Sequence, residues 1–257
     1  MTTLASSWHL AVRQMRIFYR QPVWIGIALA QPVIWLLLYG ALFAKIVQIP
    51  GFGGGSYLDY LVPGIVVMNA LFNSGWSGMT LCDDIGLGLL DRFLITPVPR
   101  RAVIAGRLIH VAAAVIIQSA VLLGLGFAIG ARFPDAGVGL VVLVSCSILL
   151  GTGIGALSGA AALQLRRPEG VLAIGNFVLL PLTFLSSVFI RQSLDTGWIQ
   201  AVSRFNPVNW TVQAGRAALD GNTDWALVLE RAGMLAVFTA ACAWLASRSF
   251  RSYRRAI

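Results

Sequence analysis

The stretch Asp83–Arg107, DDIGLGLLDRFLITPVPRRAVIAGR, is a polar interruption between two apolar runs that are each long enough to cross a membrane. It contains three acidic residues, four arginines and two prolines. A protein that is merely embedded in a membrane can join two spans with a few residues. A charged, partly amphipathic insertion therefore indicates a surface on which another molecule docks.

The rest of the chain is strongly apolar, with 58% hydrophobic and 11% charged residues among 257 and a mean hydropathy of +0.80. Soluble domains carry about 25% charged residues, so the composition predicts an integral membrane protein. The apolar runs are continuous, which favours helices over alternating strands. We expect an all-α polytopic protein, a single transmembrane domain over residues 1–257. Its six spans are Trp24–Ala44, Leu61–Leu81, Leu108–Gly130, Gly137–Leu163, Gly170–Ile190 and about Trp225–Ser247.

The distribution of charge predicts the orientation of these spans. An even number of spans places both termini on one side, and that side holds 13 of the 19 Lys and Arg residues. The same side holds four of the ten acids, so the whole net charge of +9 falls there. The positive-inside rule then places both termini in the cytoplasm. Membrane topology thus accounts for the basic composition, and no nucleic-acid partner is expected. No secretory signal peptide precedes the first span.

Two further elements lie outside the spans. Residues 4–20 carry apolar and basic residues on separate helical faces, which predicts an amphipathic helix in the inner membrane interface. The long outer connection Arg191–Asp224 contains Trp198 and Trp210, residue types that suit the interface. Its helix-like run after Pro207, closed by Gly221, predicts two short helices that dip into the outer leaflet.

Within the interruption, Asp83 and Asp84 can cap a helix start, and apolar residues then recur at helical spacing. Pro97 and Pro99 stop the run. The pattern predicts a cytoplasmic helix over residues 83–97, suited to a cleft on a soluble partner. The alternative is a simple interfacial connector.

Uncharged polar residues and glycines interrupt the spans. Gln31, Asn69, Asn73, Gln118 and Asn176 are of the kind that usually joins helices by hydrogen bonds. A stripe of glycines at four-residue spacing, Gly151 to Gly159, lets another helix approach closely. The stripe is compatible with an intrachain contact or with a dimer seam.

Several chemistries have no basis in the sequence. A phosphate-binding P-loop needs a lysine, and the single lysine, Lys45, ends the first span. The three cysteines and two histidines show no metal-ligand spacing. Asp83, Asp84 and Asp91 could hold Mg²⁺ for a lipid phosphotransferase, but their spacing matches no metal pattern.

The run Asp83–Ile109 resembles the signature of type-2 ABC exporter permeases, most closely those of daunorubicin-resistance type. An acidic start, a glycine, an L-D-R-F-like core, T-P and a later G-R make up that signature, although many members have Glu where Asp84 stands. Ser186–Leu219 resembles the family's outer segment, with its N-P and R-A-L elements. The matching positions of the first run are Asp84, Gly88, Leu90, Asp91, Arg92, Phe93, Thr96, Pro97, Gly106 and Arg107.

The resemblance implies a half-transporter of the bacterial cytoplasmic membrane. Two six-span permease subunits, identical or related, would pair around a central path and export amphiphilic drug-like or lipid-like compounds. A separate ABC ATPase subunit would carry ATP and Mg, so this chain itself binds no cofactor and is not an enzyme. The alternatives are a secondary carrier that works without an ATPase, and a lipid enzyme acting at the three aspartates.

The resemblance and the pattern together give three sets of candidate residues. Residues 83–97 would be the coupling helix that contacts the ATPase, and residues 191–224 the re-entrant outer gate. The ATPase contact is assigned to Asp84, Leu87, Leu90, Asp91, Arg92 and Phe93; the substrate path to Gln31, Trp35, Asn69, Phe72, Asn73, Asn176 and Phe184; and the outer gate to Trp198, Asn206, Pro207 and Trp210.

Overall fold

The computed structural model describes residues 22–45, 47, 56–87, 100–191 and 197–255. The described part is all-α, as predicted, and contains no strand. Its helices are α2 (Pro22–Leu42), α3 (Tyr57–Gly86), α5 (Arg100–Ala128), α6 (Ala136–Leu165), α7 (Pro168–Phe184), α8 (Gly197–Ser203), α9 (Pro207–Leu219) and α10 (Trp225–Arg255). The amphipathic helix predicted over residues 4–20 lies outside the described residues.

Three of the described helices are long and apolar enough to cross a membrane. Their spanning segments are Leu108–Ala128 in α5, Ala136–Leu165 in α6 and Trp225–Ser249 in α10. The other three predicted spans fall on α2, α3 and α7, and their crossing of the membrane stays a prediction. The two short helices predicted in the outer connection are present as α8 and α9.

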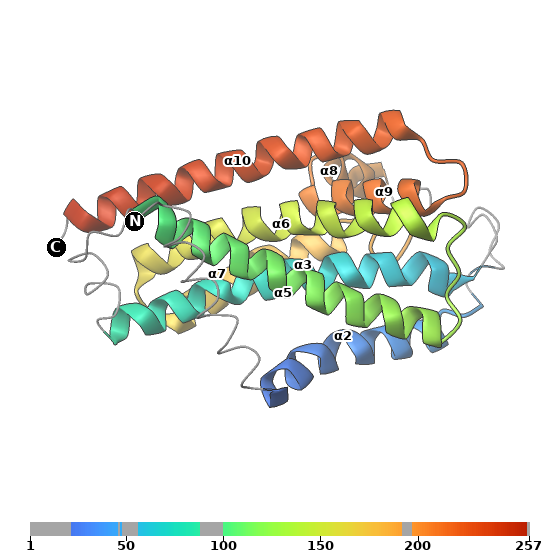
Figure 1. Cartoon of the computed structure of the whole chain (residues 1–257), viewed down its shortest axis with the longest axis horizontal. Helices are drawn as coiled ribbons and strands as arrows, with labels where there is room; N and C mark the ends of the chain where they lie inside the picture. The colour runs from blue at the N-terminus through green and yellow to red at the C-terminus, as the bar shows by residue number, and fades with distance from the viewer. Residues whose placement is uncertain (1–21, 46, 48–55, 88–99, 192–196, 256–257) are drawn as a thin grey trace.

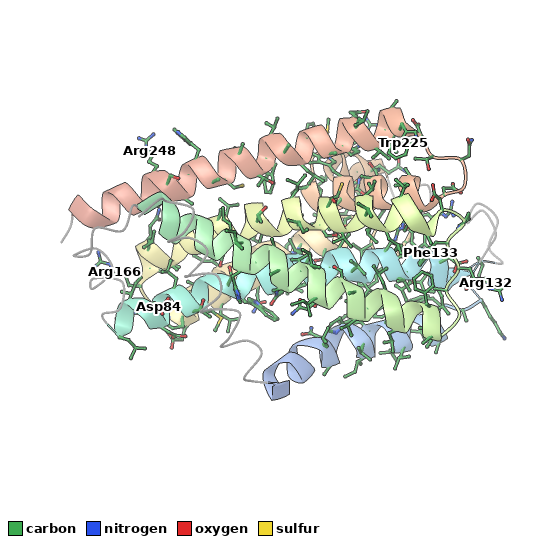
Figure 2. The ribbon with its side chains drawn as sticks, in the orientation of Figure 1. Asp84, Arg132, Phe133, Arg166, Trp225 and Arg248 are labelled. Atoms are coloured by element: carbon green, nitrogen blue, oxygen red, sulfur yellow. The ribbon has the colours of Figure 1, made fainter. Side chains whose placement is uncertain are left out.

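The long helices lie side by side along one axis, with α8 and α9 grouped near the end where α6 begins (Figure 1). Asp84, Arg166 and Arg248 mark one end of this bundle, and Arg132, Phe133 and Trp225 mark the other (Figure 2). Residues that the charge distribution assigns to the cytoplasmic side therefore share one end, and residues assigned to the outer side share the opposite end.

The glycine stripe of α6 packs inside the chain, against α3 and α5. A Cβ atom at Gly151 would lie 2.7 Å from Ser74 Oγ, and one at Gly155 would lie 3.4 Å from both Ser77 Oγ and Val111 Cγ2. The close approach is reciprocal, since a Cβ at Gly78 of α3 would come within 2.4 Å of the Ser158 carbonyl oxygen. The structure thus shows the stripe as an intrachain contact.

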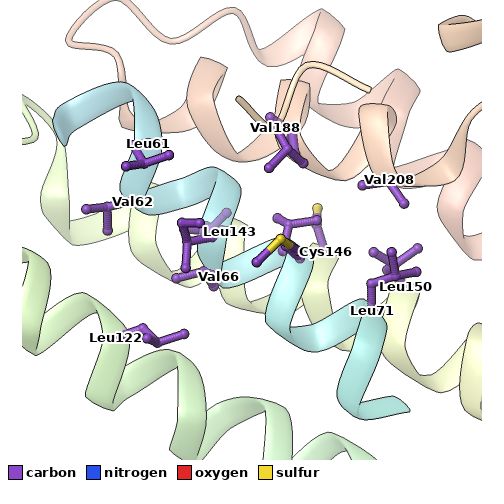
Figure 3. Packing of buried hydrophobic residues seen from close by; sticks show 14 of the residues in the cluster. Leu61, Val62, Val66, Leu71, Leu122, Leu143, Cys146, Leu150, Val188 and Val208 are labelled. Atoms are coloured by element: carbon purple, nitrogen blue, oxygen red, sulfur yellow. The ribbon is translucent and has the colours of Figure 1, made fainter. Parts of the chain in front are cut away.

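The opposite face of α6 packs on α10, which makes α6 the centre of the bundle. Gly153 faces Phe238, and Thr239 Oγ1 donates a hydrogen bond of 2.7 Å to the Leu149 carbonyl. The main core joins α3, α5, α6 and α9, and Figure 3 shows its packing. Its labelled members include Leu61, Val66, Leu122, Leu143, Leu150 and Val208.

The fifth predicted span, Gly170–Ile190, is longer than the helix found there. Helix α7 ends at Phe184, so its 17 residues extend over roughly 25 Å. Where the helix ends, Asn206 Nδ2 supplies the donor, and it bonds the Leu182 carbonyl of α7 and the Leu185 carbonyl just after it over 2.7 and 2.8 Å. Residues 185–191 continue in the same direction without helix and lie along the first turns of α3, where Ser187 and Phe189 meet Tyr60 and Tyr57.

The contact between α3 and α6 gives the first test. Gly78→Ala places a methyl group against the backbone of Ser158, so we expect about 1–3 kcal/mol of destabilisation by overpacking. Thermal unfolding of the purified protein in detergent measures this loss.

Gly124→Ala is the matched control, because Gly124 lies within α5 and nothing lies within 4 Å of a Cβ built there. The control should unfold at the wild-type temperature or slightly above it. Equal unfolding temperatures for the Gly78 variant and the wild type would contradict the close packing of α3 on α6.

Candidate functional site

The C-terminal end of α3 differs from the prediction for the polar interruption. We expected Asp83 and Asp84 to begin a new helix, but both lie in the last turn of α3, which ends at Gly86. The Leu87 N–H donates to the Asp83 carbonyl over 2.9 Å and closes that turn. The physical reason is that nothing between Leu81 and Ile85 breaks the helix, and glycine at 86 is the first residue that weakens it.

Of the predicted ATPase-contact residues, the structure describes two. Leu87 follows α3 with 71% of its side chain exposed, and Asp84 is half-buried in the last turn. An exposed leucine next to two acids fits a docking surface better than a lipid-facing one. The other members, Leu90, Asp91, Arg92 and Phe93, and the predicted helix beyond Leu87, lie outside the described residues.

The end of α3 is fixed to the ends of α6 and α7. Leu81 and Cys82 pack with Ala162, Leu163 and Val171 in a small buried cluster. Cys82 Sγ also donates to the Ala162 carbonyl over 3.8 Å. A force applied to the chain just after Gly86 is therefore transmitted to α6 and α7 as well as along α3.

At the outer end, Asn206 and Pro207 join α9 to the end of α7. Asn206 Oδ1 accepts the Val208 N–H over 2.9 Å and caps α9, while its amide group holds the last carbonyls of α7. Pro207 takes the first helical position, where a missing N–H costs nothing. Both predicted gate residues are buried and act as a fixed joint.

The two predicted gate tryptophans have different surroundings. Trp210 Nε1 donates to the Arg204 carbonyl over 2.6 Å, and its ring packs on the main core. Trp198, on α8, is 64% exposed. An exposed indole at this end of the bundle suits the membrane interface.

The turn at residues 185–191 is held by a guanidinium group that sequence reasoning missed. Arg216 of α9 donates to the carbonyls of Ser187 (2.6 Å), Val188 (3.0 Å) and Tyr60 (2.8 Å). Its Cζ lies 3.4 Å from the centre of the Tyr60 ring, a cation–π contact. Burial lowers the pKa of the Arg216 guanidinium and Tyr60 opposes that shift, but arginine remains protonated in proteins.

Tyrosines and a glycine of α3 complete this turn. Tyr60 Oη donates to the Ser187 carbonyl over 2.7 Å, and Tyr57 Oη donates to the Phe189 carbonyl over 3.1 Å. A Cβ at Gly64 would lie 2.5 Å from the Val188 carbonyl oxygen, so only glycine permits the approach. The turn is thus fastened to α3 and α9 through its own backbone oxygens.

Asn209 of α9 also forms hydrogen bonds with the turn at residues 185–191. Its Oδ1 accepts hydrogen bonds from Ser187 Oγ (2.7 Å) and the Ser187 N–H (3.2 Å), and its amide donates to the Ser203 carbonyl. The signal for Arg216 was present in the sequence, since it is the arginine of the R-A-L element in an otherwise apolar helix. The sequence pattern alone does not indicate which groups this guanidinium contacts.

The predicted substrate-path residues divide into two groups. The rings of Trp35 and Phe184 both contact the ring of Phe189, with centres 5.8 and 6.0 Å from it. Tyr39 also stacks on Phe189. The remaining residues are apart from this aromatic cluster. Asn69 donates to Gln118 Oε1 over 2.8 Å in a buried pair, Phe72 contacts Trp76, Gln31 is exposed, and Asn73 and Asn176 are half-buried.

Known transporter permeases are similar in sequence to this chain over most of its length. Residues 6–219 match the family model described as "ABC-2 type transporter". The chain is 30% identical over 244 residues to the daunorubicin resistance ABC transporter permease protein DrrB1 of Streptomyces coeruleorubidus, covering 92% of this chain and 82% of DrrB1. It is 28% identical over 229 residues to the inner membrane transport permease YadH of Escherichia coli K12, covering 85% of each chain.

A third relative is the probable doxorubicin resistance ABC transporter permease protein DrrC of Mycobacterium tuberculosis. It is 24% identical over 232 residues, which cover 89% of this chain and 81% of DrrC. All three matches cover most of both sequences, so they concern the whole architecture.

The Arg216 contacts give a second test. Arg216→Lys keeps the positive charge but removes the planar fork that reaches several acceptors. Each buried carbonyl that loses its donor costs about 1–3 kcal/mol, so we expect a clear fall in the thermal unfolding temperature and faster hydrogen exchange in residues 197–219.

Arg204→Lys is the control on the same outer segment, because the Arg204 side chain is exposed. It should leave both measurements unchanged. If Arg216→Lys behaved like this control, the guanidinium would not be what fastens the turn.

Proposed function

The chain belongs to the ABC-2 type transporter family, and from that membership we propose that it is the membrane-spanning permease subunit of an ATP-driven exporter. Its cargo would be amphiphilic drug-like or lipid-like compounds, which fits the drug-resistance names of two relatives. The observation that carries the proposal is the match over most of the chain, supported by the exposed Leu87 beside Asp84 at the end of α3.

In this proposal the energy source is a separate ABC ATPase subunit. ATP and Mg would bind on that partner, since the single lysine of this chain does not stand in a P-loop. The ATPase would contact the segment that begins at Asp84 and Leu87 and continues through Leu90, Asp91, Arg92 and Phe93. Anchoring of α3 to α6 and α7 through the Cys82 cluster would carry that contact into the bundle.

The proposed topology has six spans and both termini in the cytoplasm of a bacterial cell. Asp84, Arg166 and Arg248 lie at the same end of the bundle (Figure 2). This supports the topology, because the positive-inside rule assigns that end to the cytoplasm. Helices α2, α3 and α7 would then cross the membrane together with the three clearly apolar helices. Residues 191–224 would form the re-entrant gate at the exit.

A second permease subunit, identical or related, completes the proposed transporter. Helices α2 and α7 carry large exposed apolar side chains, among them Leu38, Phe177 and Phe184. Such surfaces need either lipid or another helix against them. The aromatic cluster around Phe189 joins these two helices and would lie beside the path between subunits.

Co-expression with a partner ABC ATPase tests the coupling assignment. Leu87→Glu alone, and Leu90→Glu with Phe93→Glu, place charge in the proposed contact. Buried anchors of an interface typically contribute about 2 kcal/mol or more, so we expect at least a tenfold loss of co-purified ATPase and of stimulated ATP hydrolysis.

Phe205→Glu is the control, since Phe205 is 82% exposed at the opposite end of the bundle. It should retain full complex formation. Complexes of wild-type yield and activity from the Leu90–Phe93 double variant would show that the coupling segment has been assigned wrongly.

A further inference from the structure

A lateral cavity of about 150 Å³ lies between α3, α6 and α7. Gly75 forms its wall on α3, Ser158 and Ala161 contribute from α6, and Gly175 and Leu179 contribute from α7. None of these residues belongs to the predicted ATPase contact, substrate path or outer gate. Two of its lining residues on α7, Ile174 and Val178, are exposed, so the cavity reaches the surface there.

The lining offers a ligand no free polar group. Ser158 is its one polar side chain, and both hydrogen-bonding directions of its hydroxyl are used by α3. Ser158 Oγ donates to the Gly75 carbonyl and accepts the Gly78 N–H, the latter over 3.0 Å. The other lining residues are glycine, alanine, valine, leucine and isoleucine, so the cavity accepts hydrocarbon.

Glycine at position 175 keeps the cavity open. A Cβ built on Gly175 meets only Trp76 Cδ1 at 3.9 Å and Leu179 Cδ1 at 4.0 Å, which are ordinary contacts. A Cβ atom therefore fits there without moving the backbone, and a longer side chain built on it would extend into the space of the cavity. A 150 Å³ apolar cavity holds about six carbon atoms, the size of a benzene ring.

The depth of the cavity matches the acyl chains of one leaflet. Its α7 residues, Val171 to Leu179, lie roughly 5 to 17 Å from the start of that helix at Pro168. Half the hydrocarbon core of a bilayer is about 15 Å thick. In the orientation of the proposed function, on which this step rests, that leaflet is the cytoplasmic one.

Charged residues of both signs lie at the helix turn nearest to the cavity. Arg166 and Arg167 are exposed in the turn between α6 and α7, about one helical turn beyond Ala161 and Val171. Glu169 lies two residues before Val171, which places it on the opposite face of α7. Asp83 and Asp84 directly follow Cys82, whose Sγ donates to the Ala162 carbonyl, so they lie at the same end of the bundle as Arg166 (Figure 2). The two arginines are the groups of this turn that can pair with a lipid phosphate.

We propose that this cavity binds one acyl chain of an anionic phospholipid of the cytoplasmic leaflet, with its phosphate beside Arg166 and Arg167. Basic residues next to a gap between membrane helices are typical of such lipid sites. The acyl chain enters from the side of the bundle, and its terminal six or so carbons fill the space between Gly175 and Ser158. The lipid is distinct from the exported cargo and bridges α3, α6 and α7 where the coupling contact meets the bundle.

The test uses two photoreactive phospholipids with the same diazirine-bearing acyl chain, one with a phosphatidylglycerol and one with a phosphatidylcholine headgroup. The full chain is reconstituted without an ATPase in vesicles that contain either probe, illuminated and digested. Mass spectrometry then locates the adducts. We expect adducts on residues 154–161 and 174–179 to exceed those on the exposed face of α10, and phosphatidylglycerol to exceed phosphatidylcholine by about threefold or more.

Gly175→Leu fills the cavity from α7, and Ala161→Leu fills it from α6, so the test survives if one variant does not fold. Either folded variant should lower the cavity adducts by about threefold or more, because the chain loses its packing contacts there. Ala173→Leu is the control, since Ala173 is exposed and two residues from Val171. It should change nothing.

Three outcomes would overturn the proposal. Adducts of equal yield on the exposed face of α10 would indicate annular lipid only. Unchanged cavity adducts in the filled variants would exclude the cavity as the site. Equal adduct yields from the two probes would exclude a preference for an anionic headgroup. None of these results bears on ATPase coupling, which is measured separately by complex formation.

Discussion

Carbonyl oxygens that no helix satisfies set the arrangement of the outer half of this protein. Residues 187–189 are buried, so water does not reach these groups and each must find a donor within the chain. Helix α7 stops at Phe184, and the turn that follows would leave its carbonyls unpaired. Asn206, Arg216 and the two tyrosines of α3 supply the donors. Helix α9 lies where it does because its asparagine cap and its arginine must both reach that turn.

Helix α3 connects this turn with the opposite end of the bundle. Tyr57 and Tyr60 contact the turn at its outer end, and Cys82 packs on α6 and α7 at its inner end. Between them, the glycines of α6 and Gly78 of α3 hold the two parallel helices in close contact. In the proposed transporter, a pull on the segment after Gly86 would reach the outer turn along α3.

The sequence predicted the fold class because apolar runs and helix breakers are local signals, and the helices of the described chain follow them. Three features were not predicted, and two of them depend on contacts that no local pattern contains. The glycine stripe of α6 showed that a partner helix exists, and only the structure identified it as α3. Asp83 and Asp84 resembled a helix start, but an unbroken helix continued through them. The role of Arg216 was the hardest to predict from the sequence, since its acceptors are backbone carbonyls of residues far apart in the chain.

Transport measured in inside-out vesicles tests the central claim, that this chain moves cargo only together with an ATPase. Vesicles that contain the chain, its neighbouring ABC ATPase or both would be given an amphiphilic fluorescent dye, with ATP or with a proton gradient. The account predicts dye accumulation only where both subunits and hydrolysable ATP are present. Accumulation by the chain alone, driven by the proton gradient, would contradict it and establish a secondary carrier.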